Sequence, residues 1–316
     1  MNISYRRSGI TISKETRKGY EIGLDPSRPK DDNINITTHG HTDHTPRKDV
    51  KGELICSPTT RRMIEFYRPN SKVRDVEKYT DENVEVKLYD AGHCLGSRMA
   101  LIRDKDNGLR TLYTGDYNTI KKYCGKAKPR RCDNLIIDST YGDKRYDFPD
   151  YRKSIKEMTD KIKENVALGH KTRILSYGFG KSQELCHILD KNNIRFSVDE
   201  KIDRINRQID VKYKNAEENA AVKIARNKIP GTKEHIIAAT GHAATSSYRF
   251  LTDADSYYVI SDHADFKQGL RFIRSCRPDN VYTVFGVNTR FAKEIKKETG
   301  IRSVPLRKGQ RLIENF

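Results

Sequence analysis

The chain has 316 residues and a formal net charge of +18, from 61 lysines and arginines against 43 aspartates and glutamates. This length is sufficient for one large domain or two linked domains. Apolar residues make up 35% of the chain, and no apolar run is long enough to span a bilayer, so we expect no membrane segment. The excess of cations favours a polyanionic partner, nucleic acid above all, and a lysine-rich solvated surface is the alternative.

The cysteines and the first ten residues favour a cytoplasmic protein. Residues 1–10 contain two arginines and no apolar stretch of the kind found in a secretory signal. The six cysteines lie far apart and form no CxxC pair, so we expect reduced thiols rather than disulfides or a cysteine zinc knuckle. These cysteines are Cys56, Cys94, Cys124, Cys132, Cys186 and Cys276.

Short apolar runs bounded by turn residues predict strands through the first half of the chain. The runs are Asn33–Thr37, Val84–Tyr89, Met99–Ile102, Thr111–Tyr113 and Asn134–Ile137. Apolar spacings of three or four residues then predict helices over 151–168, 181–189 and 288–299. Between the helices, further apolar runs predict strands at Thr172–Ser176, His235–Ala239, Ser256–Ile260 and Asn280–Phe285.

A strand-rich first half followed by alternating strands and helices predicts an α/β protein with stacked sheets flanked by helices. The segment 199–230 is the most polar part of the chain, with a thin stripe of Ile202, Ile205 and Ile209. We interpret it as a charged surface helix or hairpin rather than core. An inserted segment is expected between about Tyr141 and Thr240, with the chain on both sides returning to one core.

The most informative segment is Thr38-His39-Gly40-His41-Thr42-Asp43-His44, which holds three histidines and one aspartate within six residues. It follows the apolar run directly, so a strand that ends in a tight loop would direct these side chains into one small volume. Imidazole nitrogens and carboxylate oxygens are ligands that Zn²⁺ selects. A solvated polar loop is the alternative, but clustering of this kind identifies metal sites.

Three further polar residues lie next to predicted strands. His93 lies in the glycine-rich segment 90–97, Asp116 follows the strand that ends at Tyr113, and Asp25 precedes the histidine cluster. Each residue alone is typical of an ordinary turn. Together they supply what two metal ions about 3.5–4 Å apart require, a bridging carboxylate and additional imidazoles.

The ordered set Asp25, His39-x-His41-x-Asp43-His44, His93 and Asp116 resembles the metallo-β-lactamase fold. The segments Ile137-Asp138-Ser139-Thr140-Tyr141-Gly142 and Ser261-Asp262-His263-Ala264-Asp265-Phe266 resemble the additional motifs of the β-CASP nucleases. This family includes the cleavage-and-polyadenylation endonuclease, ribonuclease J and Artemis-like DNA nucleases. The compact length, together with the segments 24–29 and 178–184, is similar to small prokaryotic members, including exonucleases associated with DNA ligase.

The resemblance implies a four-layer αββα metallo-β-lactamase sandwich with a small inserted β-CASP-like cap. We place the first part of the core at residues 1–140, the cap at 141–240 and the return of the core at 241–316. The active site is then expected in the cleft between core and cap.

The resemblance also implies a role for each matching residue. His39, His41 and His93 would bind a first Zn²⁺, Asp43 and His44 a second, and Asp116 would bridge the two; Mn²⁺ is an alternative ion. Asp25 would orient a ligand histidine or the attacking water. The residue matching His263 protonates the leaving oxygen in the family, helped by the one matching Asp138. Asp43, His263, Asp138 and Asp25 are therefore the candidate catalytic residues.

One position departs from the pattern. In the RNA-cleaving branches a histidine completes the second zinc site where this chain has Phe285, whose side chain cannot ligate a metal. We therefore expect the second metal to bind more weakly than the first. The Artemis-like branch also carries an apolar residue there, which favours DNA exonuclease or end-processing activity slightly over RNA processing.

Three alternatives stay open. The chain is an RNA-processing endo- or exoribonuclease of the same family, an inactive nucleic-acid-binding scaffold subunit with a degenerate metal site, or a small-molecule hydrolase on the same metal core. The Asp138 and His263 motifs and the basic charge argue against the last. Lys181 and Ser182, at the start of a predicted helix, are candidate phosphate contacts.

Overall fold

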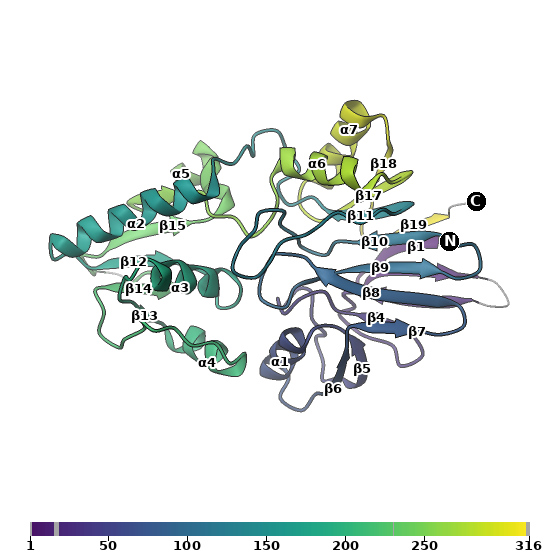
Figure 1. Cartoon of the computed structure of the whole chain (residues 1–316), viewed down its shortest axis with the longest axis horizontal. Helices are drawn as coiled ribbons and strands as arrows, with labels where there is room; N and C mark the ends of the chain where they lie inside the picture. The colour runs from purple at the N-terminus through teal and green to yellow at the C-terminus, as the bar shows by residue number, and fades with distance from the viewer. Residues whose placement is uncertain (1, 16–18, 230, 314–316) are drawn as a thin grey trace. The chain divides into compact units, whose positions relative to one another are not determined.

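The computed structural model describes residues 2–15, 19–229 and 231–313, and the chain divides into two compact units (Figure 1). The first unit contains the chain up to Asp143 and again from Phe266 onward. The second unit is the intervening segment, Lys144–Asp265. Each unit carries its own sheets and its own buried cluster.

The first unit contains two seven-stranded sheets. In one of them, β1, β2, β3 and β19 are antiparallel, and β4, β5 and β6 continue from β3 in parallel. Its strands, in spatial order, are β19 (Gln310–Ile313), β1 (Asn2–Arg6), β2 (Gly9–Lys14), β3 (Tyr20–Leu24), β4 (Ile34–Ile36), β5 (Lys51–Ile55) and β6 (Lys72–Val76).

The second sheet of this unit is also mixed. Strands β18, β17, β11 and β10 are parallel, and β9, β8 and β7 follow as antiparallel neighbours. In spatial order the strands are β18 (Arg302–Pro305), β17 (Asn280–Val284), β11 (Asn134–Asp138), β10 (Arg110–Tyr113), β9 (Arg98–Asp104), β8 (Val84–Asp90) and β7 (Lys78–Thr80).

The inward faces of these two sheets form one hydrophobic core. In β2, Ile10 and Ile12 are buried while Thr11 and Ser13 are partly exposed, as the two-residue period of a strand requires. Val84, Val86 and Ile102 contribute from the other sheet to the same cluster. The core therefore fixes the strands whose ends carry the histidine and aspartate loops.

Helices accompany the strands of the first unit. Helix α1 (Pro58–Tyr67) begins at the N-cap Ser57, whose side chain accepts a hydrogen bond from the Thr60 amide, and it packs on β6. Helix α7 (Asn288–Thr299) packs on β17 and β18. Helix α6 (Phe266–Cys276) buries an apolar face that includes Leu270 and Ile273.

The second unit is a five-stranded parallel sheet with helices. The spatial order is β13 (Ser197–Val198), β14 (Val222–Ala225), β12 (Thr172–Leu175), β15 (His235–Ala239) and β16 (Ser256–Tyr258). Its helices are α2 (Tyr151–Ala167), α3 (Lys181–Lys191), α4 (Glu200–Gln208) and α5 (Ser246–Leu251), with a short 3₁₀ turn at Gly241–Ala244.

The α/β class is confirmed, and two details differ from the sequence-based expectations. The apolar stripe of α4 is not a surface feature: Ile202 and Ile205 are fully buried, and Ile202 belongs to the core of the second unit, while Arg204 and Arg207 on the same helix are exposed. The second unit also continues past residue 240 to Asp265, because β16 extends its sheet by pairing with β15.

No helix in the described part of the chain is both long and apolar enough to cross a bilayer. None of the six cysteines forms a disulfide, and five of them are buried.

We predict that Ile205→Ala lowers the free energy of unfolding by about 2–5 kcal/mol, because it removes most of a fully buried side chain and leaves a cavity. Ile229→Ala, at a position that is 50% exposed, is the matched control and should change it by no more than about 0.5 kcal/mol. Urea unfolding followed by circular dichroism measures both values. Equal losses in the two variants would restore the surface interpretation of this segment.

Candidate metal centre

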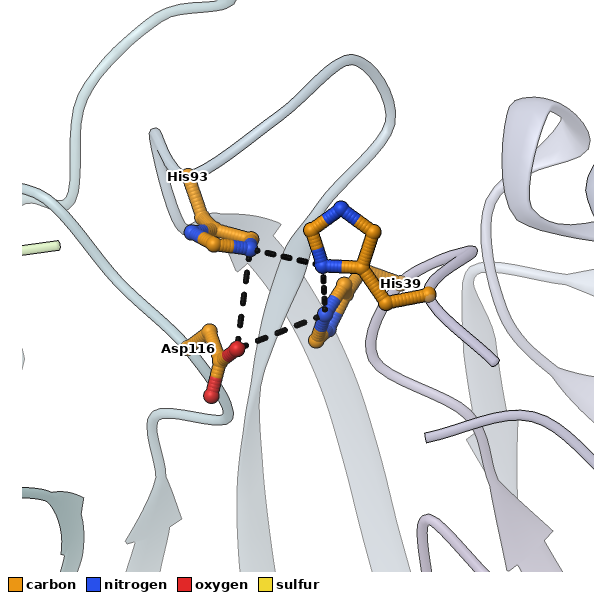
Figure 2. A group of neighbouring side chains, drawn as sticks. His39, His93 and Asp116 are labelled. Carbon is orange, nitrogen blue, oxygen red and sulfur yellow. Dashed lines mark hydrogen bonds and ion pairs between the residues drawn. The ribbon is translucent and has the colours of Figure 1, made fainter. Parts of the chain in front are cut away.

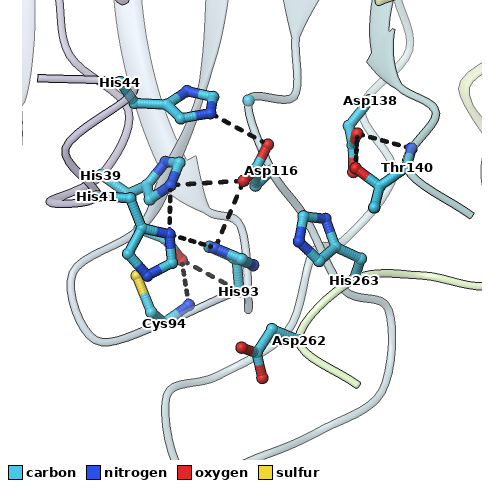
Figure 3. Close-up of polar contacts among 12 residues, drawn as sticks. His39, His41, His44, His93, Cys94, Asp116, Asp138, Thr140, Asp262 and His263 are labelled. Carbon is cyan, nitrogen blue, oxygen red and sulfur yellow. Dashed lines mark hydrogen bonds and ion pairs between the residues drawn. The ribbon is translucent and has the colours of Figure 1, made fainter. Parts of the chain in front are cut away.

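Three loops at strand ends in the first unit bring the candidate side chains together (Figure 3). The histidine cluster follows β4, His93 lies between β8 and β9, and Asp116 follows β10. Gly115 has a φ of 50°, and a Cβ there would lie 2.7 Å from the Thr38 side chain. Glycine at this position therefore lets the Asp116 loop approach the start of the histidine cluster.

Four donor atoms converge in this unit, from His39, His41, His93 and Asp116, all within 4.8 Å of one another (Figure 2). His41 Nδ1 lies 3.0 Å from His39 Nε2 and 3.1 Å from His93 Nε2. Asp116 Oδ2 lies 3.5 Å from the Nε2 atoms of both His39 and His93. His39 and His93 are almost completely buried.

These separations fit a single metal ion. Nitrogen and oxygen ligands at about 2.0–2.1 Å in a tetrahedral site lie about 3.3 Å from one another. The four separations given above, 3.0–3.5 Å, bracket that value, and the other two pairs of donors lie within 4.8 Å. Three imidazoles and one carboxylate also match the donor types of a transition-metal site. The four side chains therefore form a candidate metal-binding group.

A hydrogen-bond chain orients the His39 ring. The Thr38 hydroxyl lies 2.8 Å from Asp25 Oδ2 and 3.0 Å from His39 Nδ1. Because the Asp25 carboxylate only accepts, the hydroxyl donates to it and its oxygen accepts from His39 Nδ1–H. This arrangement leaves His39 Nε2 without a proton and directed at the other donors, as a metal ligand requires.

Asp25 holds more than this one ring. It is buried, with a φ of 47°, and it accepts hydrogen bonds of 2.7 Å from both the Thr38 amide and the Tyr113 hydroxyl. Its Oδ2 also lies 2.8 Å from His44 Nδ1. One carboxylate thus connects the end of β3, the histidine loop and the end of β10.

His44 occupies a strongly negative position. Its Nε2 lies 3.5 Å from Asp116 Oδ1, the oxygen that does not face His39 and His93. Burial lowers the pKa of His44, but the charges of Asp116 and Asp25 outweigh burial and raise the pKa to about 10. The ring is therefore a cation between carboxylates at neutral pH when no metal is present.

The donors predicted for a second metal are less complete. Asp43 Oδ2 lies 3.9 Å from His44 Nε2, and the Asp43 side chain is 81% exposed. The Phe285 ring packs against the His44 ring with 5.1 Å between centroids. Asp43, His44 and Asp116 form no compact donor group among the described residues. The donors on the His44 side of Asp116 are thus less complete and more exposed than those on the side of His39 and His93.

Asp138 ends β11 in the same unit and is buried. Its carboxylate accepts hydrogen bonds from the Thr140 amide at 2.9 Å and the Thr140 hydroxyl at 2.7 Å. An Asp138 oxygen lies within 4.8 Å of an Asp116 oxygen. The structure therefore places Asp138 beside the metal-binding group.

The remaining candidates lie in the second unit. His263 follows β16, and its amide donates to the Ser261 hydroxyl at 3.1 Å. Lys181 is buried, donates to Glu184 at 2.6 Å and to the Ile260 carbonyl at 2.7 Å, and also forms an ion pair with Asp262. The Ser182 hydroxyl donates to the Gly178 carbonyl.

These contacts argue against the predicted phosphate role of Lys181 and Ser182, because internal partners already use their donors. Lys181 instead ties the start of α3 to the loop that carries His263, through Ile260 and Asp262. A lysine near a helix start in the sequence carries no sign of such buried carboxylate partners.

Sequence reasoning missed Thr38 and Tyr113 as parts of the site. Thr38 orients His39, and Tyr113 fixes Asp25 from the other sheet. Thr38 directly precedes the histidine cluster, which is the one signal that could have indicated it. Tyr113 lies at a buried strand end, where a tyrosine is ordinarily a core residue.

The chain is similar to two curated proteins over much of its length and matches none of the protein-family models with which it was compared. It is 25% identical over 313 residues to a probable DNA ligase of Opitutus terrae, which covers 85% of this chain and 30% of that protein. It is 29% identical over 221 residues to an RNase J-like protein of Methanocaldococcus jannaschii, covering 58% of this chain and 52% of that one. The chain thus spans about a third and about half of these relatives.

A solved structure supports the fold alone. A protein of unknown function from Enterococcus faecalis superimposes with a TM-score of 0.65 and 9% sequence identity, covering 98% of this chain and 99% of that chain.

We predict that Asp25→Asn lowers the affinity of the chain for Zn²⁺ by about 10- to 100-fold, because the amide keeps only one of the two acceptor oxygens and loses the charge that together orient Thr38, His39 and His44. Asp32→Asn, at an exposed position, is the control and should leave the affinity unchanged. Competition against a chromogenic chelator measures both values. Equal affinities in the two variants would remove Asp25 from the metal centre.

Proposed function

We propose that this chain, whose curated relatives are β-CASP members of the metallo-β-lactamase family, is a metal-dependent nuclease that hydrolyses phosphodiester bonds. The relatives confirm the resemblance carried by the motifs. The observation that carries the proposal is the convergence of the donor atoms of His39, His41, His93 and Asp116 within 4.8 Å of one another.

We assign the architecture in finer terms on the same basis. The two sheets of the first unit share one core, and helices α1 and α7 pack on their strands, which supports a four-layer αββα sandwich. The second unit, with its own parallel sheet, would be the inserted cap. The cap so proposed is longer at its C-terminal end than residues 141–240.

Zinc is the ion we assign to the site, with Mn²⁺ as the alternative, because three imidazoles and one carboxylate suit a borderline cation. A bound zinc ion would supply a water whose pKa is lowered to about 7, which makes hydroxide available at neutral pH. His39, His41, His93 and Asp116 would hold the first ion. Asp43, His44 and the second oxygen of Asp116 would hold the weaker second ion.

We assign the bridging, orienting and proton-transfer roles to residues of the chain itself. Asp116 presents one oxygen to His39 and His93 and the other to His44, which supports a bridging role. Asp25 keeps the ligand rings oriented through Thr38 and His44. The leaving oxygen requires a proton, and we assign its delivery to His263, assisted by Asp138. The Asp138 carboxylate accepts two hydrogen bonds from Thr140, which fix its orientation and support the assisting role.

The substrate we propose is nucleic acid, with a slight preference for DNA exonuclease or end-processing activity. Phe285 and the similarity to a probable DNA ligase favour DNA, and the similarity to an RNase J-like protein keeps RNA processing as the alternative. The charge of +18 suits either polyanion. An inactive binding subunit is the remaining alternative. The cytoplasmic location stays a prediction.

We predict that the chain cleaves end-labelled single-stranded DNA or RNA when Zn²⁺ or Mn²⁺ is supplied, and that a chelator abolishes cleavage. His39→Ala should lose both the metal and the activity. His263→Ala should retain the metal but lower kcat by about 10²- to 10⁴-fold, as expected for loss of a general acid. Gel analysis of the labelled strands, with metal analysis of each variant, gives these results.

His170→Ala is the matched control, because His170 is exposed and outside the donor group. It should cleave like the unmodified chain. If the unmodified chain binds nucleic acid but cuts neither polymer with either metal, the inactive-scaffold alternative is correct. Full activity in His263→Ala would exclude it as the proton donor.

We predict one tightly bound zinc per chain and a second that dialysis removes first. Phe285→His should increase retention of the second ion, because it adds an imidazole beside His44. Phe285 has a φ of 61°, a region that histidine adopts more readily than a bulky apolar residue, so the exchange should be tolerated. Metal analysis during stepwise dialysis tests this; two equally tight ions in the unmodified chain would contradict it.

A further inference from the structure

A basic hollow lies in the first unit, between the segment that follows Asp116 and helix α6. Its volume is about 190 Å³. One wall is formed by Thr119 and residues 126–129, and the other by the α6 residues Gln268, Arg271, Phe272 and Ser275. Nothing in the catalytic roles assigned above uses this hollow.

The hollow is suited to an anion. Lys126, Lys128 and Arg271 supply three positive charges, and no carboxylate is among the residues that line it. All three cationic side chains are exposed, and no ion pair joins them to an acidic residue in the part of the chain that is described. Thr119, Gln268 and Ser275 add neutral hydrogen-bonding groups to the walls.

The wall at residues 119–129 is anchored to the loop that carries His93. The Asn118 amide donates to the Ala91 carbonyl at 2.8 Å, and the Ala127 amide donates to the Asn118 carbonyl at 2.8 Å. At Gly92 a Cβ would lie 2.6 Å from Lys126 Cα, so the backbones meet without space for a side chain. Lys126 and Lys128 therefore lie on a segment that packs directly against the loop carrying the candidate metal ligand His93.

The other wall is connected to the Asp116 loop. The Phe272 ring, which lines the hollow, packs against the Tyr117 ring with 4.9 Å between centroids. Thr119 follows Asp116 by three residues, so their Cα atoms are at most about 11 Å apart. A strand with one phosphate at the metal centre therefore has other phosphates within reach of this hollow.

We propose that this hollow binds the sugar-phosphate backbone of the nucleic-acid strand beside the scissile phosphate, and this rests on the proposed nuclease function. Lys126, Lys128 and Arg271 contact phosphates and displace their counterions, which adds affinity without reading sequence. The hollow therefore strengthens binding of a strand without recognising its bases, and it does not distinguish DNA from RNA.

The test compares two triple variants of the metal-loaded full chain. One is Lys126→Ala, Lys128→Ala and Arg271→Ala. The matched control is Lys293→Ala, Lys296→Ala and Lys297→Ala, which removes three exposed cations from α7 of the same unit. Each variant is titrated against a single-stranded 20-nucleotide DNA whose phosphorothioate linkages resist hydrolysis. Fluorescence anisotropy gives Kd at several salt concentrations.

In the hollow variant, the slope of log K against log salt should fall in magnitude by about 2. Each phosphate contact to a single strand contributes about 0.7 to that slope, and the variant removes three such contacts. The control should retain the slope of the unmodified chain. Equal slopes in the two variants would overturn the proposal. If the hollow variant melts at a lower temperature than the control, Lys126→Gln and Lys128→Gln repeat the measurement singly, each with an expected decrease of about 0.7.

The measurement separates this proposal from the nuclease function, because binding is recorded without cleavage. If the salt slope falls in the hollow variant but the unmodified chain never cuts an unmodified strand, the binding proposal stands and the nuclease function is rejected. An unchanged slope in a chain that does cut would reject the hollow alone.

Discussion

The buried carboxylate of Asp25 is the interaction on which the site depends. It accepts hydrogen bonds from the Thr38 amide and hydroxyl and from the Tyr113 hydroxyl, and it lies beside His44. Thr38 belongs to a loop of one sheet and Tyr113 to a strand of the other. A buried carboxylate is tolerated only with such partners, so the two sheets must align at this point for the charge to be stable.

The metal-binding group follows from that alignment. Because Thr38 receives its orientation from Asp25, His39 directs Nε2 toward His41 and Asp116. The close approach of Gly115 to Thr38 brings the Asp116 loop to the same place. Asp116 then shares its two oxygens between the enclosed group and His44, which accounts for one well-formed donor set and one that Phe285 leaves incomplete.

The sequence predicted most of this site because its key residues are local or directly follow strands. His39, His41 and His44 lie within six residues, so their meeting needs only a turn. The contribution of Tyr113 depends on the packing of two sheets, which spacing in the chain does not encode. Similarly, the polar and charged composition of α4 favours a surface helix, yet Ile202, Ile205 and the C-cap residue Ile209 suffice to bury one face of it. The place of Lys181 at a helix start predicts a phosphate contact, whereas two of its three partners, Ile260 and Asp262, lie about 80 residues along the chain.

The measurement that tests the central claim most directly is zinc K-edge X-ray absorption of the chain loaded with one equivalent of zinc. Coordination by His39, His41, His93 and Asp116 predicts only nitrogen and oxygen neighbours at about 2.0–2.1 Å, with the outer scattering of three imidazoles. A sulfur neighbour at about 2.3 Å, or a shell of oxygens without imidazole, would contradict the account.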